Sequence, residues 1–295
     1  MDGILIIDKP AGITSHDVVA GVRRILRTRR VGHTGTLDPF ATGVMVVLVG
    51  KATRLAQFLD KDEKEYEATV HFGFETDTGD RTGVPSVPSE MRDQDIADAL
   101  SSVEWDPIFN EFLGETDQIP PMYSAKKIDG QKLYEIARKG ERIERKPVRV
   151  TISKLEFVDK EAFRIRVVCS AGTYIRTLAE DIGRTAGIGA HLAELRRTRS
   201  GRFTIDQSIT LDALGERHDP QTKLLDMTEA VVHLPAVTLD QDRAEKTRNG
   251  LSTRLADPAF ADGEPIRMLD ENGNLLAVGA YDEAERSVNP KVVLS

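Results

Sequence analysis

The sequence of 295 residues predicts an α+β fold followed by a small β module. Segments with strand and helix patterns alternate irregularly, without a repeating βαβ period, and this disfavours a doubly wound sheet. After about residue 217 the pattern changes to short strand-like pieces. The chain is longer than a single hydrophobic core usually grows, so we expect a main domain at residues 1–232 and a small β domain at residues 233–295.

The first sixty residues predict a strand, a helix, a turn-rich loop and a second strand. Residues 4–7 are all Ile or Leu, which is typical of a buried strand. The loop at residues 32–39 is rich in Gly and Thr, and it leads into the apolar run 44–49, which predicts an interior strand. Ser15 is expected to cap a helix, because the apolar residues after it recur at helical spacing: Val18, Val19, Val22, Ile25 and Leu26.

The next part of the chain predicts a strand, an acidic excursion and a helix. Apolar residues alternate with mostly polar ones between residues 66 and 74, so a half-buried strand is expected there. Residues 76–90 are rich in Gly, Pro, Asp and Ser, and we interpret them as an excursion that does not contact RNA. Ile96, Leu100 and Val103 share one face of a predicted helix at residues 95–103.

Two further strands and three further helices are predicted before residue 200. The strands are expected at residues 148–152 and 163–167. The helices are expected at residues 131–139, 173–186 and 190–196, and Gly140 and Gly187 end the first two.

The C-terminal module predicts a β-hairpin. Strand-like segments at residues 265–269 and 275–279 flank Asn272-Gly273. Because Asn and Gly tolerate positive φ angles, this pair predicts a type I′ turn.

Charge is unevenly distributed along the chain. The net charge is −8, but residues 1–60, 121–160 and 161–205 are each positive, whereas residues 61–120 and 206–295 carry the acidic excess. A basic surface that could bind phosphates is therefore compatible with the acidic total. There is no signal-peptide pattern, no apolar run near 20 residues and only one cysteine, so we expect a cytoplasmic protein that does not bind a membrane.

Most common catalytic motifs are missing from the sequence. The histidines and the cysteine show no zinc-ligand spacing, and the sequence contains no nucleophile elbow. The loop that contains Gly32 and Gly35 does not have the lysine of a phosphate-binding loop. Cys169 lies in an apolar strand and is interpreted as an inert core thiol. Carboxylate chemistry remains, and Asp38 is placed for it in the turn before a buried strand, although such an aspartate alone is more often a turn residue.

The run at residues 32–43, Gly-His-Thr-Gly-Thr-Leu-Asp-Pro-Phe-Ala-Thr-Gly, resembles the catalytic-aspartate motif of the TruB family, the bacterial tRNA pseudouridine-55 synthases. Five further segments match that family in the same order. They are Asp8-Lys9-Pro10, Lys64-Glu65-Tyr66, residues 119–127, residues 172–178 and residues 192–198. The resemblance covers about residues 3–215.

This resemblance implies a pseudouridine synthase fold, with a mixed and largely antiparallel sheet flanked by helices. Residues 1–232 would be the catalytic domain, and residues 233–295 would resemble the RNA-binding PUA module. The implied reaction is isomerisation of uridine-55 in the T loop of tRNA, with base flipping and with no cofactor and no metal. The implied partner is the T-arm stem-loop of tRNA, and no obligatory protein partner is expected.

The resemblance also assigns roles to single residues. Asp38 would be the catalytic carboxylate, and Arg176 would be its counter-charge, which a carboxylate needs to stay ionised in a water-poor pocket. Tyr66 would stack on the flipped base, and its hydroxyl is a candidate for moving the C5 proton. His33 would fill space that flipped nucleotides leave, and Leu195 would line the uracil pocket.

Further residues are expected to bind RNA. Tyr174 belongs to the motif that contains Arg176. Lysines and arginines of the positive segments are expected to contact phosphates, which position an RNA without reading its sequence. They include Lys9, Lys126, Lys127, Arg196 and Arg197, and also Arg23, Arg24, Arg29, Arg30, Lys132, Arg199 and Arg202. The alternatives are a non-catalytic tRNA-binding or tRNA-folding protein and a relative of the synthases that depend on a guide RNA.

Overall fold

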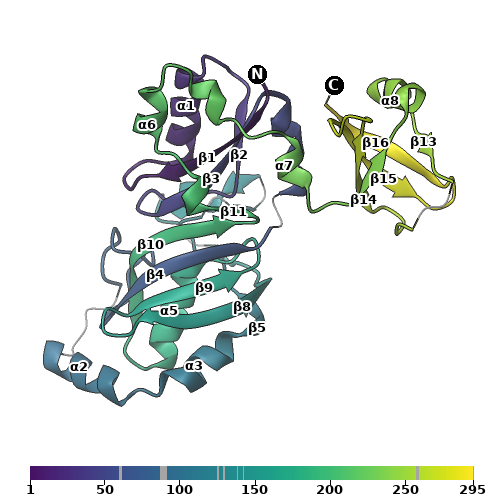
Figure 1. Cartoon of the computed structure of the whole chain (residues 1–295). Coiled ribbons are helices and arrows are strands. Elements are labelled where there is room, and N and C mark those ends of the chain that lie inside the picture. The colour runs from purple at the N-terminus through teal and green to yellow at the C-terminus, as the bar shows by residue number, and fades with distance from the viewer. Residues whose placement is uncertain are drawn as a thin grey trace.

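The structure is a computed structural model, and it consists of a large sheet with flanking helices and a smaller C-terminal sheet (Figure 1). It describes residues 1–59, 62–86, 92–124, 126–128, 130–137, 139–141, 143–256 and 259–294. The side chains of residues 93, 127 and 132 lie outside this description. No helix in the described ranges is both long enough and apolar enough to cross a membrane.

The large sheet is mixed and mainly antiparallel, as expected. Its main path runs β1-β3-β10-β4-β9-β8-β5, while β2 pairs with β3 and β11 pairs with β10. Among the described pairs of this sheet, only β3 and β10 run parallel. The strands are β1 (Gly3–Lys9), β2 (Val31–Thr34), β3 (Thr42–Val49), β4 (Lys64–Phe72), β5 (Gly114–Gln118), β8 (Val148–Asp159), β9 (Arg164–Cys169), β10 (Ala190–Ser200) and β11 (Phe203–Thr204).

The helix predicted after residue 15 is present as α1 (Ser15–Ile25), but its cap differs from the prediction. Thr14 is the N-cap, since its hydroxyl oxygen accepts from the Asp17 amide while the Asp17 carboxylate accepts from the Thr14 amide. Ser15 is the first helical residue, and its hydroxyl is bonded instead to the loop before β3. The 3-10 helix η1 (Gly50–Phe58) follows β3.

The helix predicted at residues 190–196 is wrong, because this segment is the strand β10. Its Ala, Leu, Glu and Arg residues favour helices intrinsically, yet β10 lies between β3 and β4 in the middle of the sheet. Leu192 and Leu195 are buried against the core there, with a register shift between Leu192 and Glu194. Long-range strand pairing therefore overrides local propensity.

The remaining helices of the large part differ from prediction mainly at their ends. The helix expected at residues 131–139 is only α4 (Leu133–Ala137), because residues 131 and 132 form β7, which pairs with β6 (Lys127–Ile128). The helix expected at 173–186 begins later, as α5 (Ile175–Thr185). Other helical segments are α2 (Asp93–Ser102), α3 (Trp105–Phe112), η2 (Ile205–Gln207), α6 (Leu211–Gly215), η3 (Pro220–Lys223) and α7 (Thr228–Val231).

The C-terminal sheet has the order β12-β14-β15-β16-β13. Its elements are β12 (Ala236–Thr238), α8 (Gln241–Arg248), β13 (Thr253–Arg254), β14 (Pro265–Leu269), β15 (Leu275–Asp282) and β16 (Ser287–Val293). The predicted hairpin joins β14 and β15, but the type I′ turn is wrong. Only Gly273 has a positive φ, of 81°, and the bonds from Gly273 N to Asp270 O and from Asp270 N to Asn274 O make a three-residue loop.

The two sheets share a hydrophobic contact. Ile4, Val46 and Leu55 belong to the same buried cluster as Val278 and Val292. Figure 1 shows the C-terminal sheet beside the N-terminal part, on the far side of α7 and away from the lower end where α2 and α3 lie. The small module is therefore attached to the β1–β3 side of the large sheet.

Candidate active site

A pocket of about 290 Å³ lies where five segments of the large part meet. They are the loop between β2 and β3, the start of β4, the segment after β5 that contains Ser124, the loop between β9 and α5 with the start of that helix, and the middle of β10. The volume is close to the lower end of the ~300–1,000 Å³ range typical of small-molecule sites. Its lining includes Asp38, Tyr66, Tyr174, Arg176, Leu195 and Arg197 of the predicted residues, together with Lys64 and Ser124.

The loop that carries Asp38 is held rigidly on both sides. The Ser15 hydroxyl accepts from the Leu37 amide at 2.9 Å and is 3.1 Å from the Leu37 carbonyl oxygen. The Lys9 ammonium donates to the carbonyls of Pro39, at 3.2 Å, and Ala41, at 2.7 Å. These bonds fix the backbone on each side of Asp38, and a fixed backbone is what a precisely placed carboxylate needs.

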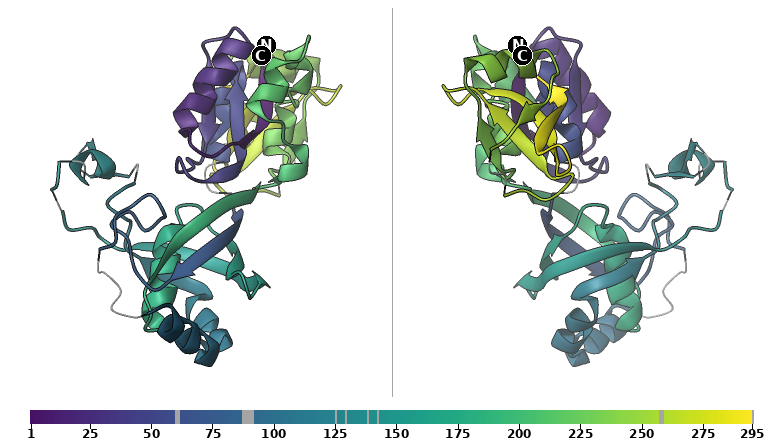
Figure 2. Two further views of the ribbon diagram at one scale, coloured as in Figure 1. Left: turned by 90° about the vertical axis from the view of Figure 1, so that its left-hand side faces the viewer. Right: turned by 90° about the vertical axis from the view of Figure 1, so that its right-hand side faces the viewer.

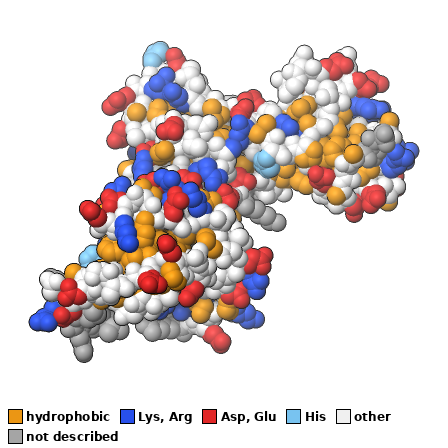
Figure 3. All heavy atoms as spheres, turned by 60° about the horizontal axis from the view of Figure 1, so that its bottom comes forward, with side chains coloured by type: hydrophobic (Ala, Val, Ile, Leu, Met, Phe, Trp, Pro, Cys, Tyr) orange, Lys and Arg blue, Asp and Glu red, His pale blue; other side chains and the backbone are white. Residues whose placement is uncertain are grey.

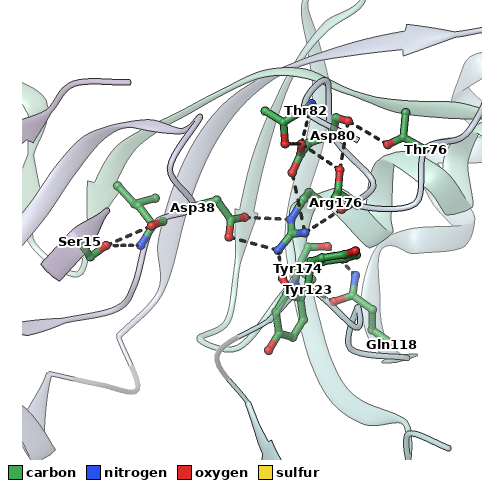
Figure 4. A network of polar contacts seen from close by, with 11 residues as sticks. Ser15, Asp38, Thr76, Asp80, Thr82, Gln118, Tyr123, Tyr174 and Arg176 are labelled. Carbon is green, nitrogen blue, oxygen red and sulfur yellow. Dashed lines mark hydrogen bonds and ion pairs between the residues drawn. The ribbon is translucent and has the colours of Figure 1, made fainter. Parts of the chain in front are cut away.

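Asp38 and Arg176 form a two-contact ion pair (Figure 4). Arg176 Nε lies 2.9 Å from Asp38 Oδ2, and Arg176 Nη2 lies 3.2 Å from Asp38 Oδ1. The same guanidinium donates to the backbone carbonyls of Thr78, at 2.7 Å, and Tyr123, at 2.8 Å. Arg176 is only 4% exposed, so its orientation is determined by these four contacts and not by solvent.

Burial raises the pKa of Asp38 above its ordinary value. The second carboxylate nearby, Asp80, acts in the same direction, whereas Arg176 and Lys9 act against it. About a third of the Asp38 side chain remains exposed to the pocket, so it can meet a ligand there. The ion pair therefore offsets part of the cost of holding a charged group in the pocket.

Asp80 is a site residue that the sequence prediction missed. It is buried, and its carboxylate lies 3.8 Å from Arg176 on the side away from Asp38. It accepts from the Thr78 hydroxyl at 3.0 Å, the Thr82 amide at 2.9 Å and the Thr82 hydroxyl. Figure 4 shows Arg176 between the two aspartates. The interpretation of residues 76–90 as an excursion overlooked this role, and the cluster of Thr and Asp at 76–82 was the available signal.

Tyr66 and Leu195 form walls of the pocket from neighbouring strands. Leu195 of β10 pairs with Ala68 of β4, two residues after Tyr66. Both side chains are nearly buried, at 8% and 7% exposed. Burial raises the pKa of the Tyr66 hydroxyl, although the Arg197 guanidinium beside it acts in the opposite direction. An aromatic face and an aliphatic face thus flank Asp38.

The start of α5 forms another wall. Tyr174 is the N-cap residue of this helix and lines the pocket. Gln118 of β5 fixes its backbone, because the side-chain oxygen of Gln118 accepts from the Tyr174 amide at 2.7 Å and its NH2 group donates to the Tyr174 carbonyl at 3.0 Å. Arg176 is two residues further along, so these bonds also position the guanidinium.

His33 lies on β2, beside the pocket and outside its lining. Its ring is 6.3 Å from that of His16, in an edge-on arrangement. Burial lowers the pKa of His33, and His16 and Arg197 contribute in the same direction. Its buried Nδ1 has no hydrogen-bond partner among the described residues.

Lys9 and Arg197, which were expected to contact phosphates, lie in the interior of the protein. Lys9 is 0% exposed and Arg197 is 1% exposed. Arg197 donates to the carbonyls of Val44, at 2.6 Å, and Gly35, at 3.1 Å, and so supports the Asp38 loop. Burial lowers the pKa of Lys9 to about 8, with Asp38 opposing. A contact to phosphates on the surface does not fit this placement, because the polar ends of both side chains are bonded to the backbone.

Arg196 and Lys126 remain closer to the surface. The Arg196 guanidinium pairs with both Asp8 oxygens, at 2.8 and 3.1 Å, and its side chain is 41% exposed. Lys126 is partly exposed, and the side chain of Lys127 lies outside the described residues. Figure 3 shows Lys and Arg side chains across the middle of one face, with carboxylates among them. Part of this basic band is therefore neutralised within the protein.

Ser124 and Lys64 line the pocket without having been predicted as site residues. The Ser124 hydroxyl is buried and lacks a hydrogen-bond partner within the described part of the chain. Cys169, in contrast, is a buried core thiol whose pKa burial raises to about 11. The described residues contain no group of three or more His, Cys, Asp or Glu side chains that could hold a metal ion.

Two family models match the chain in succession. The model for the TruB family pseudouridylate synthase (N terminal domain) matches residues 23–175, and the model for the tRNA pseudouridylate synthase B C-terminal domain matches residues 176–232.

Curated proteins are similar to the chain over most of its length. It is 44% identical to tRNA pseudouridine synthase B of Aromatoleum aromaticum, over 100% of this chain and 93% of that protein. It is also 44% identical to the protein of the same name from Geobacillus thermodenitrificans, over 88% of this chain and 87% of that protein.

Solved structures with a similar fold include chains from RNA-protein particles. One belongs to the structure titled "Structure of H/ACA RNP bound to a substrate RNA containing 2'-deoxyuridine", with a TM-score of 0.73 and 28% identity. Another belongs to the "Crystal Structure of a Cbf5-Nop10-Gar1 Complex", with a TM-score of 0.72 and 28% identity. Each match covers 99% of this chain and 85% of the other.

Proposed function

The chain belongs to the TruB family of pseudouridylate synthases, and we propose that it isomerises uridine-55 in the T loop of tRNA to pseudouridine. The enzyme is an isomerase of tRNA, as its curated relatives are by name. The observation that carries the choice of catalytic group is the Asp38 carboxylate, held by Arg176 in a pocket with an aromatic and an aliphatic wall.

The reaction breaks the bond between N1 of uracil and C1′ of ribose, turns the base, and joins C5 to the same C1′. No atom is gained or lost overall, because the proton released from C5 is balanced by a proton taken up at N1. A carboxylate can serve as a nucleophile or can stabilise positive charge that develops at C1′. Asp38 has the reach for either role, since part of its side chain faces the pocket.

Arg176 keeps Asp38 oriented and favours its ionised form. Its two contacts with the carboxylate leave little freedom for the Asp38 side chain. Tyr66 offers a flat face to the extruded base, and such stacking contributes about 1–3 kcal/mol per base. This energy offsets part of the few kcal/mol that unstacking the target nucleotide costs. Leu195, from the neighbouring strand, also lines the pocket and helps to exclude water from it.

We infer that the RNA partner is the T-arm stem-loop and that no protein or guide RNA is required. The match to tRNA pseudouridine synthase B proteins over nearly the whole chain supports this choice. The structural similarity to chains of H/ACA particles favours the guide-dependent alternative, since those titles name an RNP and the proteins Nop10 and Gar1. The two alternatives predict different requirements for turnover.

The test uses purified protein and an unmodified tRNA transcript whose uridines carry tritium at C5. We expect tritium release without any added protein or guide RNA, and no release when uridine-55 is replaced by cytidine. Release that continues with the cytidine transcript would assign a different position. Release that appears only with a guide RNA would support the alternative, and bound tRNA without any release would indicate a non-catalytic protein.

The Asp38→Asn variant tests the residue assignment. It keeps the size of the side chain and removes the charge, so RNA binding should be retained while tritium release is abolished. Asp98→Asn, an exposed position on α2, is the matched control and should leave turnover unchanged. Substantial turnover by Asp38→Asn would exclude Asp38 as the catalytic carboxylate.

A further inference from the structure

A cluster of five arginines surrounds the C-terminal end of α1. The α1 arginine cluster consists of Arg23, Arg24, Arg27, Arg29 and Arg30, and all five side chains are exposed. A helix dipole favours cations only within the last turn of a helix, which explains Arg23 and Arg24 but not the other three. Arg24, Arg27 and Arg29 line a shallow groove of about 670 Å³.

The cluster is not neutralised by the rest of the described chain. No described carboxylate lies within ion-pair distance of any of its members, whereas Arg149, Arg184 and Arg196 all pair with Asp or Glu. Arg23 donates to the Val31 carbonyl and Arg30 donates to the Thr53 hydroxyl, so these two have structural bonds. The side chains of the other three have no such bond to a described residue. Like charges this close repel one another, and an anionic ligand would relieve that repulsion.

The cluster is connected to the candidate active site by α1 itself. Ser15, at the N-terminal end of the helix, is bonded to Leu37 beside Asp38. The helix has 11 residues, and at 1.5 Å per residue it is about 16 Å long. Figure 2 shows α1 along the outer surface of the N-terminal part. An RNA helix whose loop enters the pocket extends well beyond 16 Å, so its backbone can reach both places.

We propose that the α1 arginine cluster binds backbone phosphates of the substrate RNA, outside the loop that enters the pocket. This inference rests on the proposed function and adds a second contact surface to it. Arginine suits the role because its guanidinium binds phosphate oxygens with two parallel hydrogen bonds. Contacts to phosphates position the RNA without reading its sequence, so the cluster would contribute affinity and orientation, not choice of base.

The test is a triple variant, Arg24→Gln, Arg27→Gln and Arg29→Gln, which removes three charges and spares the two arginines with structural bonds. The control is Lys146→Gln, Lys160→Gln and Lys223→Gln, which removes three exposed charges that lie outside residues 233–295 and form no ion pair with a described residue. Binding of a tRNA transcript is measured over a range of salt concentrations for both variants and the wild type. Turnover is measured at low and at saturating tRNA.

We expect the arginine variant to bind tRNA at least about tenfold more weakly at low salt, with a salt slope smaller by about 2 to 3. Its KM should rise while kcat stays unchanged, because no substituted residue lies in the pocket. The lysine control should match the wild type. An arginine variant with the salt slope of the control would overturn the proposal. If the wild type binds tRNA but releases no tritium, the proposed function fails. The comparison of salt slopes between the arginine variant and the control still tests the role of the cluster in RNA binding.

Discussion

Asp38 and Arg176 are 138 positions apart in the sequence, yet their side chains meet through two contacts of 2.9 and 3.2 Å. Arg176 also contacts two backbone carbonyls and lies 3.8 Å from Asp80, so one buried guanidinium joins the loop that carries Asp38 to residues 78–80 and to Tyr123. The orientation of the carboxylate thus depends on the whole network and not on the loop alone.

Arg176→Lys should reduce kcat on the order of 10²-fold while RNA binding is largely retained. Lysine keeps the positive charge, but a single ammonium cannot match both carboxylate oxygens and also replace the bonds to Thr78 and Tyr123. The measurement is single-turnover tritium release together with RNA affinity. Arg184→Lys, on the same helix but half exposed, is the control and should leave kcat unchanged. Full turnover by Arg176→Lys would show that the charge alone suffices.

Ser15→Ala and Thr14→Ala separate support of the loop from capping of the helix. Removing the Ser15 hydroxyl leaves the buried amide of Leu37 without its acceptor, which costs about 1–3 kcal/mol and loosens the loop that carries Asp38. Removing the Thr14 cap costs about 1 kcal/mol of stability and leaves the loop bonds in place.

We therefore expect both variants to unfold at lower urea concentration but only Ser15→Ala to lose kcat. Urea denaturation and single-turnover tritium release, measured on the same preparations, check this. Equal kcat for the two variants would mean that the bonds between Ser15 and Leu37 do not position Asp38.

Local patterns predicted much of the first domain. β1 and β3 are buried on both faces and α1 on one face, and the sequence shows this directly as continuous apolar runs and as apolar residues at helical spacing. The irregular alternation of elements was likewise enough to favour an α+β domain over a doubly wound sheet, whereas the mixed, largely antiparallel sheet was predicted from the family resemblance. The strand β10 could not be recognised in this way, because its residues favour helix and only its pairing with β3 and β4 makes it a strand.

The site was predictable only where a resemblance supplied it. Spacing alone left Asp38 as a turn residue, since nothing local indicates an arginine 138 positions away. Lys9 and Arg197 were expected at the surface because lysine and arginine usually are. In the folded structure both side chains are buried and bonded to backbone carbonyls, Lys9 to Ala41 and Arg197 to Val44 of β3 and to Gly35, and no local pattern shows these contacts. Asp80 was not predicted because no local pattern indicates that it lies beside Arg176 in the folded structure.

Tyr66→Phe and Tyr66→Ala distinguish stacking from proton transfer. Phenylalanine keeps the aromatic face, so RNA affinity should be retained, whereas alanine should weaken binding by about 1–3 kcal/mol. Because burial raises the pKa of the Tyr66 hydroxyl, this group keeps its own proton near neutral pH, so it can take the C5 proton only while it passes its own proton on to another group. We expect Tyr66→Phe to lower kcat for tritium release with little change in KM. An unchanged kcat would limit Tyr66 to stacking.

Glu180→Gln should stabilise the protein at pH 8 but not at pH 4.5. Burial raises the pKa of Glu180 from 4.5 to about 7, and the neighbouring carboxylates of Glu75 and Asp181 add to the shift while Arg184 opposes it. Since the folded protein holds this proton more tightly than the unfolded chain, the contribution of Glu180 to stability is full below pH 4.5 and is lost as the pH rises through 7.

Above pH 7 the wild type therefore bears the cost of an ionised, largely buried carboxylate, which amounts to at most about 3 kcal/mol at ~1.4 kcal/mol per pH unit. Glutamine carries no charge at any pH, so the variant should be more stable than the wild type by up to this amount at pH 8, and the difference should vanish at pH 4.5. Urea denaturation at both pH values measures the difference in the free energy of unfolding. The control is Glu283→Gln, at an exposed position, which should leave the free energy of unfolding unchanged at both pH values. The same stability difference at both pH values would show that ionisation of Glu180 is not its cause.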